Sequence, residues 1–345
     1  MRRSWINLAL PIGLPIGLLA GLQTAAAGEP CCPAPEGLRI AGFVDASYLG
    51  NLQQRGDSFR LDQVELDLEH HAADGLVLRA DLQTDGDGEL AVEQGFVKLP
   101  LPLVPAYALS VGKFNAPMGV ELLDAPDMFQ FSHSLLFDFG LPTNLTGALL
   151  EGPLAGPVDL KLFVVNGWDV NNDTNASRSF GGRVGADLGL WGALGASFIS
   201  GREDGVKTGG PEDLQVFDLD YLIRPRDNLC LFAELNLGSV KPVGGSSLAW
   251  SGALLGGHYD FTPVWGATLR YDWLTDDDGV LFGPVGTENQ TRSSLTAALT
   301  AAAAPGRTVL LEVRLDGSDQ DAFQDADDAP ASSTLGLALE FTQTF

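Results

Sequence analysis

The chain has 345 residues, with 45 acidic against 20 basic side chains and a formal net charge of −25. A chain this acidic repels nucleic-acid phosphates, which excludes nucleic acid as a partner. Three cysteines are too few to form a disulfide framework in a chain of this length.

The amino terminus has the pattern of a secretory signal peptide. Arg2 and Arg3 precede an apolar run over 6–22, and the small residues at 25–27 offer a cleavage site before Gly28. The alternative, a membrane anchor helix, is disfavoured because the run is short and contains two prolines. We therefore expect a signal peptide over 1–27, a short leader over 28–37 that holds Cys31 and Cys32, and a single domain over 38–345.

Beyond the leader, apolar and polar side chains alternate with a period of two. Phe217, Leu219 and Tyr221, for example, interleave with Asp218 and Asp220. This is the period of a β-strand, and runs of about ten residues are long enough to cross a bilayer at a tilt. We predict about sixteen strands (a range of about 14–18) at 38–49, 58–71, 75–84, 89–99, 106–115, 143–152, 157–167, 178–188, 191–201, 212–224, 228–239, 247–260, 263–275, 290–303, 307–317 and 331–345.

The connections between these strands alternate between short turns and long loops. An even number of strands with this asymmetry is typical of a transmembrane antiparallel up-and-down β-barrel, in which the long loops lie outside the cell. A soluble β-sandwich is the alternative all-β fold. The tryptophans that follow the leader fall near predicted strand ends, as expected for interfacial girdles: Trp168, Trp191, Trp250, Trp265 and Trp273.

The longest connection, over 116–142, follows the fifth strand and is rich in apolar residues. Exposing so many apolar side chains to water would cost free energy, so we expect this third external loop to fold into the lumen of the barrel. Packing against a neighbouring protomer is the alternative. Inside the lumen, Glu121, Asp124 and Asp127 would stand at the narrowest point, opposed by inward-facing Arg79, Arg183 or Arg270.

The polar side chains of the alternating runs are the other candidates for the pore lining. They are Glu65, Asp67, Asp81, Asp187, Asp218, Asp220, Glu234, Asp272, Glu312 and Arg314. A water-filled space lined mainly by carboxylates favours cations.

One set of residues in and around the third loop carries a resemblance to a known family. These motif residues are Gly112, Lys113, Phe114, Pro117, Gly119, Glu121, Ser132, Ser134, Pro142 and Gly147. In this segment the chain resembles the OmpL-like β-barrel porins. The resemblance implies an outer-membrane porin and allows a homotrimer, although no sequence pattern specifies a trimer interface.

Patterns for catalysis and metal binding are weak. Ser132 and Ser134 flank His133, but neighbouring side chains of an extended segment point apart. No nucleophile elbow, P-loop or zinc-protease motif occurs. The acidic stretch from Asp169 lacks the glycine and the glutamate of a calcium-binding loop. We predict no enzymatic activity, no cofactor and no dedicated metal site.

The last strand ends on an apolar aromatic residue. Leu335, Leu337, Leu339, Phe341 and Phe345 share one parity, and the ending resembles the carboxy-terminal strand of bacterial outer-membrane proteins. We expect partners in outer-membrane lipid and lipopolysaccharide, and in the barrel-assembly machinery through Phe345.

Together these patterns predict an outer-membrane channel for passive diffusion of small hydrophilic solutes or ions, with a preference for cations. Two alternatives remain. One is a non-transporting outer-membrane barrel, either a lipolytic enzyme or a surface adhesion or structural module. The other is a soluble periplasmic β-protein.

Overall fold

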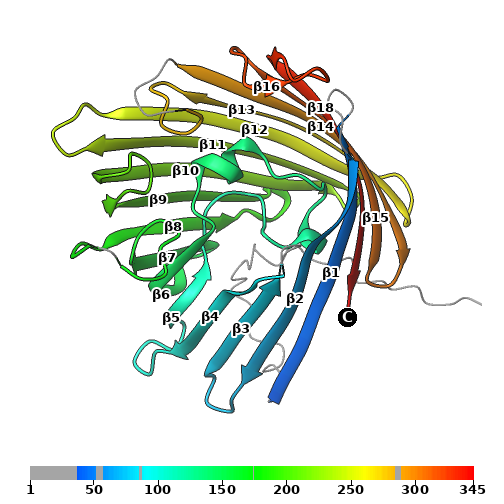
Figure 1. The fold of residues 1–345 in the computed structure, drawn as a ribbon. Coiled ribbons are helices and arrows are strands. Elements are labelled where there is room, and N and C mark those ends of the chain that lie inside the picture. Colours follow the sequence, from blue (N-terminus) through cyan, green and yellow to red (C-terminus); the bar gives the residue numbers. More distant parts are fainter. Residues whose placement is uncertain (1–36, 52–56, 85–87, 174, 284–288) are drawn as a thin grey trace, which may run out of the picture.

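The computed structural model describes residues 37–51, 57–84, 88–173, 175–283 and 289–345. The expected signal peptide over 1–27, together with Cys31 and Cys32 of the leader, lies outside the described residues. β-Strands make up most of the described chain (Figure 1). None of the helices in the described ranges has the length and apolar character needed to span a membrane.

Sixteen long strands of the described residues form a closed wall. They are β1 (Gly37–Asn51), β2 (Asp57–His71), β3 (Val77–Thr84), β4 (Leu90–Pro100), β5 (Ala108–Asn115), β6 (Asn144–Ala155), β7 (Val158–Val165), β8 (Ser179–Asp187), β9 (Ala193–Asp204), β10 (Pro211–Arg226), β11 (Leu229–Pro242), β12 (Leu248–Asp260), β13 (Trp265–Asp276), β14 (Gln290–Ala304), β15 (Arg307–Ser318) and β18 (Ser333–Thr344). Each pairs antiparallel with the next, and β18 pairs with β1 to close the barrel. The predicted barrel and its number of strands are confirmed.

The remaining elements are short. β16 (Phe323–Gln324) and β17 (Pro330–Ala331) form a small two-stranded sheet in the connection between β15 and β18, which the sequence did not predict. The short helices η1 (Ala125–Asp127) and η2 (Leu136–Gly140) lie between β5 and β6, and η3 (Gly189–Trp191) lies between β8 and β9. These insertions leave the order of the wall strands unchanged.

The two faces of the wall follow the alternation of the sequence. On the outer face, Leu235 and Leu269 are 52% and 59% exposed, whereas the neighbouring Glu234 and Arg270 are 3% and 0% exposed on the inner face. Apolar side chains can thus meet the hydrocarbon of a membrane while the backbone groups pair within the closed sheet.

The tryptophans divide into two groups. Trp191, Trp265 and Trp273 are exposed, as a girdle requires. The same expectation is wrong for Trp168 and Trp250, which are 6% and 1% exposed and meet edge to face inside the barrel, with ring centroids 6.5 Å apart. Closeness to a strand end does not say on which side of the wall a residue lies, and Trp250 has the inward parity of β12.

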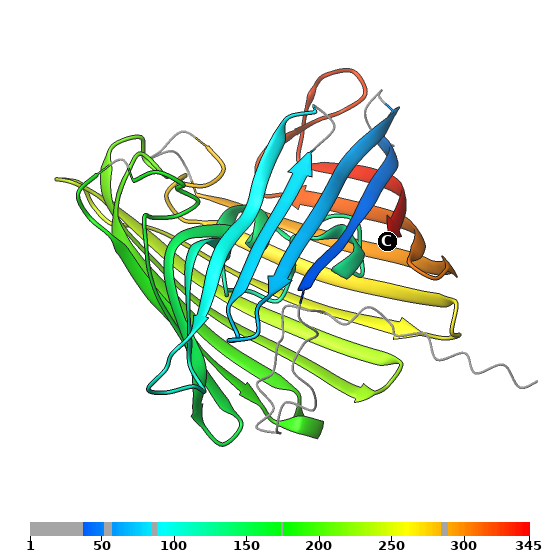
Figure 2. The same cartoon turned by 90° about the horizontal axis from the view of Figure 1, so that it is seen from below.

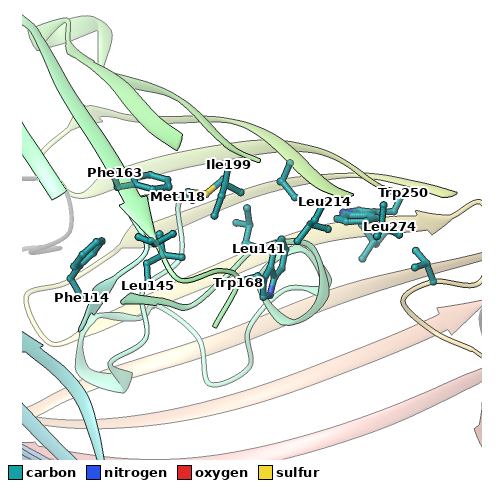
Figure 3. Packing of buried hydrophobic residues seen from close by; sticks show 14 of the residues in the cluster. Phe114, Met118, Leu141, Leu145, Phe163, Trp168, Ile199, Leu214, Trp250 and Leu274 are labelled. Atoms are coloured by element: carbon teal, nitrogen blue, oxygen red, sulfur yellow. The ribbon is translucent and has the colours of Figure 1, made fainter. Parts of the chain in front are cut away.

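One side of the interior is filled by a hydrophobic core (Figure 3). The inner face of the wall from β6 to β13 contributes Leu145, Phe163, Ile199, Leu214, Trp250 and Leu274, and the segment between β5 and β6 contributes Met118 and Leu141. Burial of these apolar side chains stabilises the fold, which a purely polar lining of the lumen would not do. The core therefore occupies part of the space that the barrel encloses.

Candidate functional site

The segment over 116–143, between β5 and β6, enters the barrel and carries η1 and η2 across its interior (Figures 1 and 2). We call this segment the inserted loop. Its residues Leu135 and Leu136 are 5% and 0% exposed and pack against the wall of the same chain. The expectation that the third external loop folds into the lumen is confirmed.

Carboxylates of the wall hold the inserted loop by its backbone. The contacts join the N–H of Gly119 to Asp218 (3.1 Å), of Val120 to Glu234 (2.7 Å), of Phe131 to Glu312 (2.8 Å) and of Leu135 to Asp272 (3.0 Å). The structure therefore places these four candidates for the pore lining beneath the loop rather than beside open space.

Two arginines of the wall hold the loop by its carbonyls. Arg270 donates to the carbonyl of Ser132 (2.6 Å) and to that of His133 (3.0 Å), and Arg314 donates to the same His133 carbonyl (2.5 Å). Arg270 also forms an ion pair with Glu121 of the loop (2.6 Å). Burial opposes ionisation of Glu121, but the Arg270 guanidinium holds the pKa of that carboxyl below its usual value.

A cavity of about 280 Å³ remains between the inserted loop and the wall. The loop side presents Glu121, Asp124 and Asp127, and the wall side presents Arg79 of β3, Lys161 of β7 and Arg183 of β8. The predicted opposition of loop carboxylates to Arg79 and Arg183 is therefore present in space. Arg270 does not border this cavity, because the loop covers it.

The charged groups of the cavity differ in how they are compensated. Arg183 forms a two-pronged contact with Asp220 (2.5 and 2.7 Å), and Nε of Arg79 contacts Asp81 (2.8 Å). Within the described ranges, Lys161 has neither an ion pair nor a hydrogen bond. Sequence reasoning missed Lys161, although it shares the inward parity of Phe163 on β7 and could have been found from that pattern.

The two acidic groups of the loop next to η1 titrate differently. Burial, and then the carboxylate of Glu93, raises the pKa of Asp124 to about 8. Burial, and then Asp67, raises the pKa of Asp127 only to about 6. Asp127 is therefore the one of this pair that is mainly ionised at neutral pH.

The other predicted site residues lie in separate places. Glu65, Asp67 and Asp81 come together on the inner face of β2 and β3, with Arg79 beside them. Asp187 lies at the end of β8, where it accepts the N–H of Gly189 (2.9 Å), and takes no part in the cavity.

The motif residues concentrate where the inserted loop leaves and rejoins the wall. Gly112 has a φ of 140°, and a Cβ there would lie 2.1 Å from the carbonyl oxygen of Gly95, so only glycine permits this approach of β5 to β4. Gly119 has a φ of 78° and turns its N–H toward Asp218. Gly147 lies on β6 opposite Gly112.

The other motif residues have structural contacts of several kinds. Phe114 is buried in the core, and Pro117 and Pro142 border the cavity. The N–H groups of Ser132 and Ser134 donate to Glu312 and Glu121, and Lys113 donates to the carbonyl of Val92.

The serine and histidine residues of the loop do not form a nucleophile and base. His133 Nε2 donates to the carbonyl of Leu122 (2.7 Å), and its ring stacks on Phe137 with centroids 4.0 Å apart. The Ser132 and Ser134 backbones are bound to wall and loop carboxylates, as described above. Among the described residues, no hydrogen bond joins His133 to a serine hydroxyl.

A closed antiparallel barrel with an apolar outer face and an inserted loop that narrows its interior defines the porin class of outer-membrane proteins. No curated protein has detectable sequence similarity to the chain. Residues 39–345 match the family described as putative beta-barrel porin-2, OmpL-like, and the chain belongs to that family. The predicted family and bacterial outer-membrane location are thereby confirmed.

Solved outer-membrane proteins have a similar fold. A loop L8 deletion mutant of OmpT from Vibrio cholerae has a TM-score of 0.67 at 10% identity, covering 90% of this chain and 99% of that one. The channel DcaP of Acinetobacter baumannii has a TM-score of 0.66 at 11% identity, covering 91% and 100%. An anion-selective porin from Comamonas acidovorans has a TM-score of 0.64 at 12% identity, covering 90% and 99%. At such identities the likeness concerns the fold alone.

Proposed function

We propose that this porin forms a water-filled channel through which small hydrophilic solutes or ions diffuse passively, with a preference for cations. The observation that carries the proposal is the cavity of about 280 Å³ that the inserted loop leaves along one side of the barrel. Its border is charged on both sides, so it favours water and polar solutes over apolar ligands. Passive diffusion needs no bond to be made or broken, and the proposal includes no enzymatic activity and no cofactor.

The balance of charge supports the cation preference. In the cavity, Arg79 and Arg183 are each paired with a wall carboxylate, whereas Asp127 of the loop and Lys161 of the wall have no salt bridge within the described part of the chain and offset each other. The chain as a whole carries a formal net charge of −25, which favours cations in an enclosed water-filled space. The similar fold of an anion-selective porin means that the sign of selectivity depends on such lining residues rather than on the barrel.

The partners belong to the same proposal. The exposed leucines of the outer face would contact lipid and lipopolysaccharide. Phe345 is 67% exposed beyond the end of β18, where the barrel-assembly machinery could reach it. OmpT of Vibrio cholerae has been solved in a trimer form, and a homotrimer is the assembly that we propose here. A cleaved signal peptide over 1–27 would direct export.

Recording from single proteins in a planar lipid bilayer tests this function. We expect stepwise conductance, and in a KCl gradient a reversal potential with the sign of a cation-preferring pore. A purified, folded barrel that gives no conductance steps would overturn the channel. Clear steps with an anion-type reversal potential would instead overturn the preference for cations and leave the channel standing.

A further inference from the structure

Three carboxylates from distant parts of the chain meet where the inserted loop passes β2 and β4. Glu65 belongs to β2, Glu93 to β4 and Asp124 to the loop, and one oxygen of each lies within 4.8 Å of the others. We propose that these three residues bind one divalent cation of the size of Ca²⁺, which links the inserted loop to the wall. This site goes beyond the channel function proposed above.

A β-bulge brings Glu93 into the group. Asp81 of β3 pairs with Gln94, and the next residue, Leu82, pairs with Val92, so Glu93 is the extra residue of β4. In a regular strand, Glu93 and Gln94 would point to opposite faces. Here both are buried, at 1% and 8% exposure, because the bulge turns both side chains inward.

The carboxylates of the group lack compensation. Oε1 of Glu65, Oε2 of Glu93 and Oδ1 of Asp124 are buried, and within the described part of the chain none of these atoms has a hydrogen-bond partner. Glu65 and Glu93 are each only 1% exposed, and their other oxygens accept from amide groups of Gln63 (3.0 Å) and Asn115 (3.1 Å). No lysine or arginine of the described ranges forms an ion pair with any of the three. Buried carboxylates without a counter-charge carry a large desolvation cost, which a cation among their free oxygens removes.

In the neighbouring acidic group, an arginine supplies the counter-charge. Glu65 also approaches Asp67 and Asp81. There, Arg79 contacts Asp81 at 2.8 Å and Asp67 at 3.9 Å, so a guanidinium already supplies the positive charge. Among the described residues, Arg79 acts on Asp124 only at longer range, and no lysine or arginine forms an ion pair with Glu65, Glu93 or Asp124. This difference points to the group with Asp124 as the cation site.

The kind of ligand set favours calcium over magnesium. The three residues come from two strands and a loop, and they offer carboxylate oxygens without regular octahedral placement. Calcium accepts irregular ligand sets completed by water, whereas magnesium requires near-octahedral geometry.

A cation at this position would give the loop a second attachment. Arg270, Arg314 and the wall carboxylates beneath the loop hold one part of it, and the cation would hold the start of η1 against β2 and β4. Without a cation, the three carboxyls must retain protons or move apart. The rival arrangement is therefore shared protons, and it predicts no calcium binding near neutral pH.

Calcium binding to the folded, detergent-solubilised protein provides the test and requires no conductance. The protein is freed of metal with a chelator and titrated with CaCl₂ or MgCl₂ by isothermal calorimetry at pH 7.5 in 0.15 M KCl, which screens diffuse binding to exposed carboxylates. We expect one saturable calcium site per chain and at least tenfold weaker binding of magnesium. Glu65→Gln, Glu93→Gln and Asp124→Asn should each weaken calcium binding at least tenfold.

Asp327→Asn is the matched control, because it removes one negative charge from an exposed loop residue outside the group. It should bind calcium as the wild type does. Thermal unfolding followed by circular dichroism verifies the fold of each variant. Calcium should raise the unfolding temperature of the wild type and of Asp327→Asn but not that of Glu93→Gln. A wild type without saturable calcium binding, or an undiminished site in Glu93→Gln, would overturn the proposal.

Discussion

Arg270 of β13 and Glu121 of the inserted loop form an ion pair, with 2.6 Å between Nη1 and Oε1 and side-chain exposures of 0% and 3%. Asp272, two residues along the same strand, contacts Nε of Arg270 at 3.0 Å. One guanidinium thus contacts a carboxylate of the loop and a carboxylate of the wall, and it also binds two loop carbonyls. Arg270 therefore joins the loop to the wall through both its charge and its hydrogen bonds.

Replacing Arg270 should therefore loosen the loop. Arg270→Met leaves Glu121 and Asp272 buried without their counter-charge, and we expect a loss of about 3–5 kcal/mol in the free energy of unfolding. The double variant with Glu121→Gln should lose less than the sum of the two single variants. Urea unfolding in detergent measures both quantities. Arg60→Met breaks a longer contact (3.5 Å) between the exposed Arg60 and the half-buried Asp62 and should cost less than about 1 kcal/mol. An equal loss there would contradict a special role of Arg270.

The apolar packing of η2 makes a separate prediction. Leu136 is 0% exposed and lies in a cluster with Leu222, Phe232 and Leu254 of the wall. Leu136→Ala should create a cavity and cost about 2–5 kcal/mol. Leu103→Ala, at a residue 94% exposed in the turn between β4 and β5, should stay within about 0.5 kcal/mol of the wild type. Thermal unfolding of both variants compares the two sites directly.

Lys207 gives the protein a dependence on alkaline pH. It lies in the loop between β9 and β10, 4.3 Å from the ring centroid of Trp168, and donates to the carbonyl of Phe139 (3.1 Å). Burial lowers its pKa from 10.5 to about 8. Because the folded protein then releases this proton at a lower pH than the unfolded chain, the contribution of Lys207 to the free energy of unfolding should rise between pH 8 and 10.5.

The comparison of wild type with Lys207→Met isolates this effect. In the variant, the rise should be absent, and the difference in slope should not exceed about 1.4 kcal/mol per pH unit, the value for one proton. Urea unfolding at several pH values over this range measures it. Parallel curves for the two proteins would contradict a lowered pKa at Lys207.

Two single charges of the cavity should shift ion selectivity in opposite directions. Asp127→Asn removes a carboxylate and should reduce the preference for K⁺ over Cl⁻, whereas Lys161→Gln should increase it. We expect changes of several-fold, since a unit charge about 4 Å from a permeating ion contributes about 1 kcal/mol in water. Reversal potentials in a KCl gradient measure the effect. Asp327→Asn is the control in an exposed loop, and a shift of the same sign in both cavity variants would contradict the assignment.

The sequence predicted the fold well because the barrel depends on one simple rule. Phe217 and Leu219 alternate with Asp218 and Asp220. Each strand needs this period of two, because its outer face meets hydrocarbon and its inner face meets water or polar groups. The apolar composition of the inserted loop was equally informative, since a loop with Leu135 and Leu136 requires a core to cover it.

The inner surface was harder to predict. Leu145 and Phe163 have inward parity and join the core, although alternation alone favours polar residues there. The bulge at Glu93 shifts the parity of β4 by one residue, and a single extra residue leaves no mark in composition. The binding of Glu234 to the loop backbone depends on how two distant segments meet, which a local pattern does not contain.

Wall carboxylates hold the inserted loop by its backbone, so the position of the loop depends in part on groups other than the side chains that it presents to the cavity. Glu234 and Glu312 accept from the N–H groups of Val120 and Phe131, and every residue except proline keeps these donors. Loop side chains other than anchors such as Glu121 and Leu136 can therefore be exchanged while the path of the loop across the lumen is kept. A barrel built in this way is a suitable scaffold for redesigning solute preference by changing the loop alone.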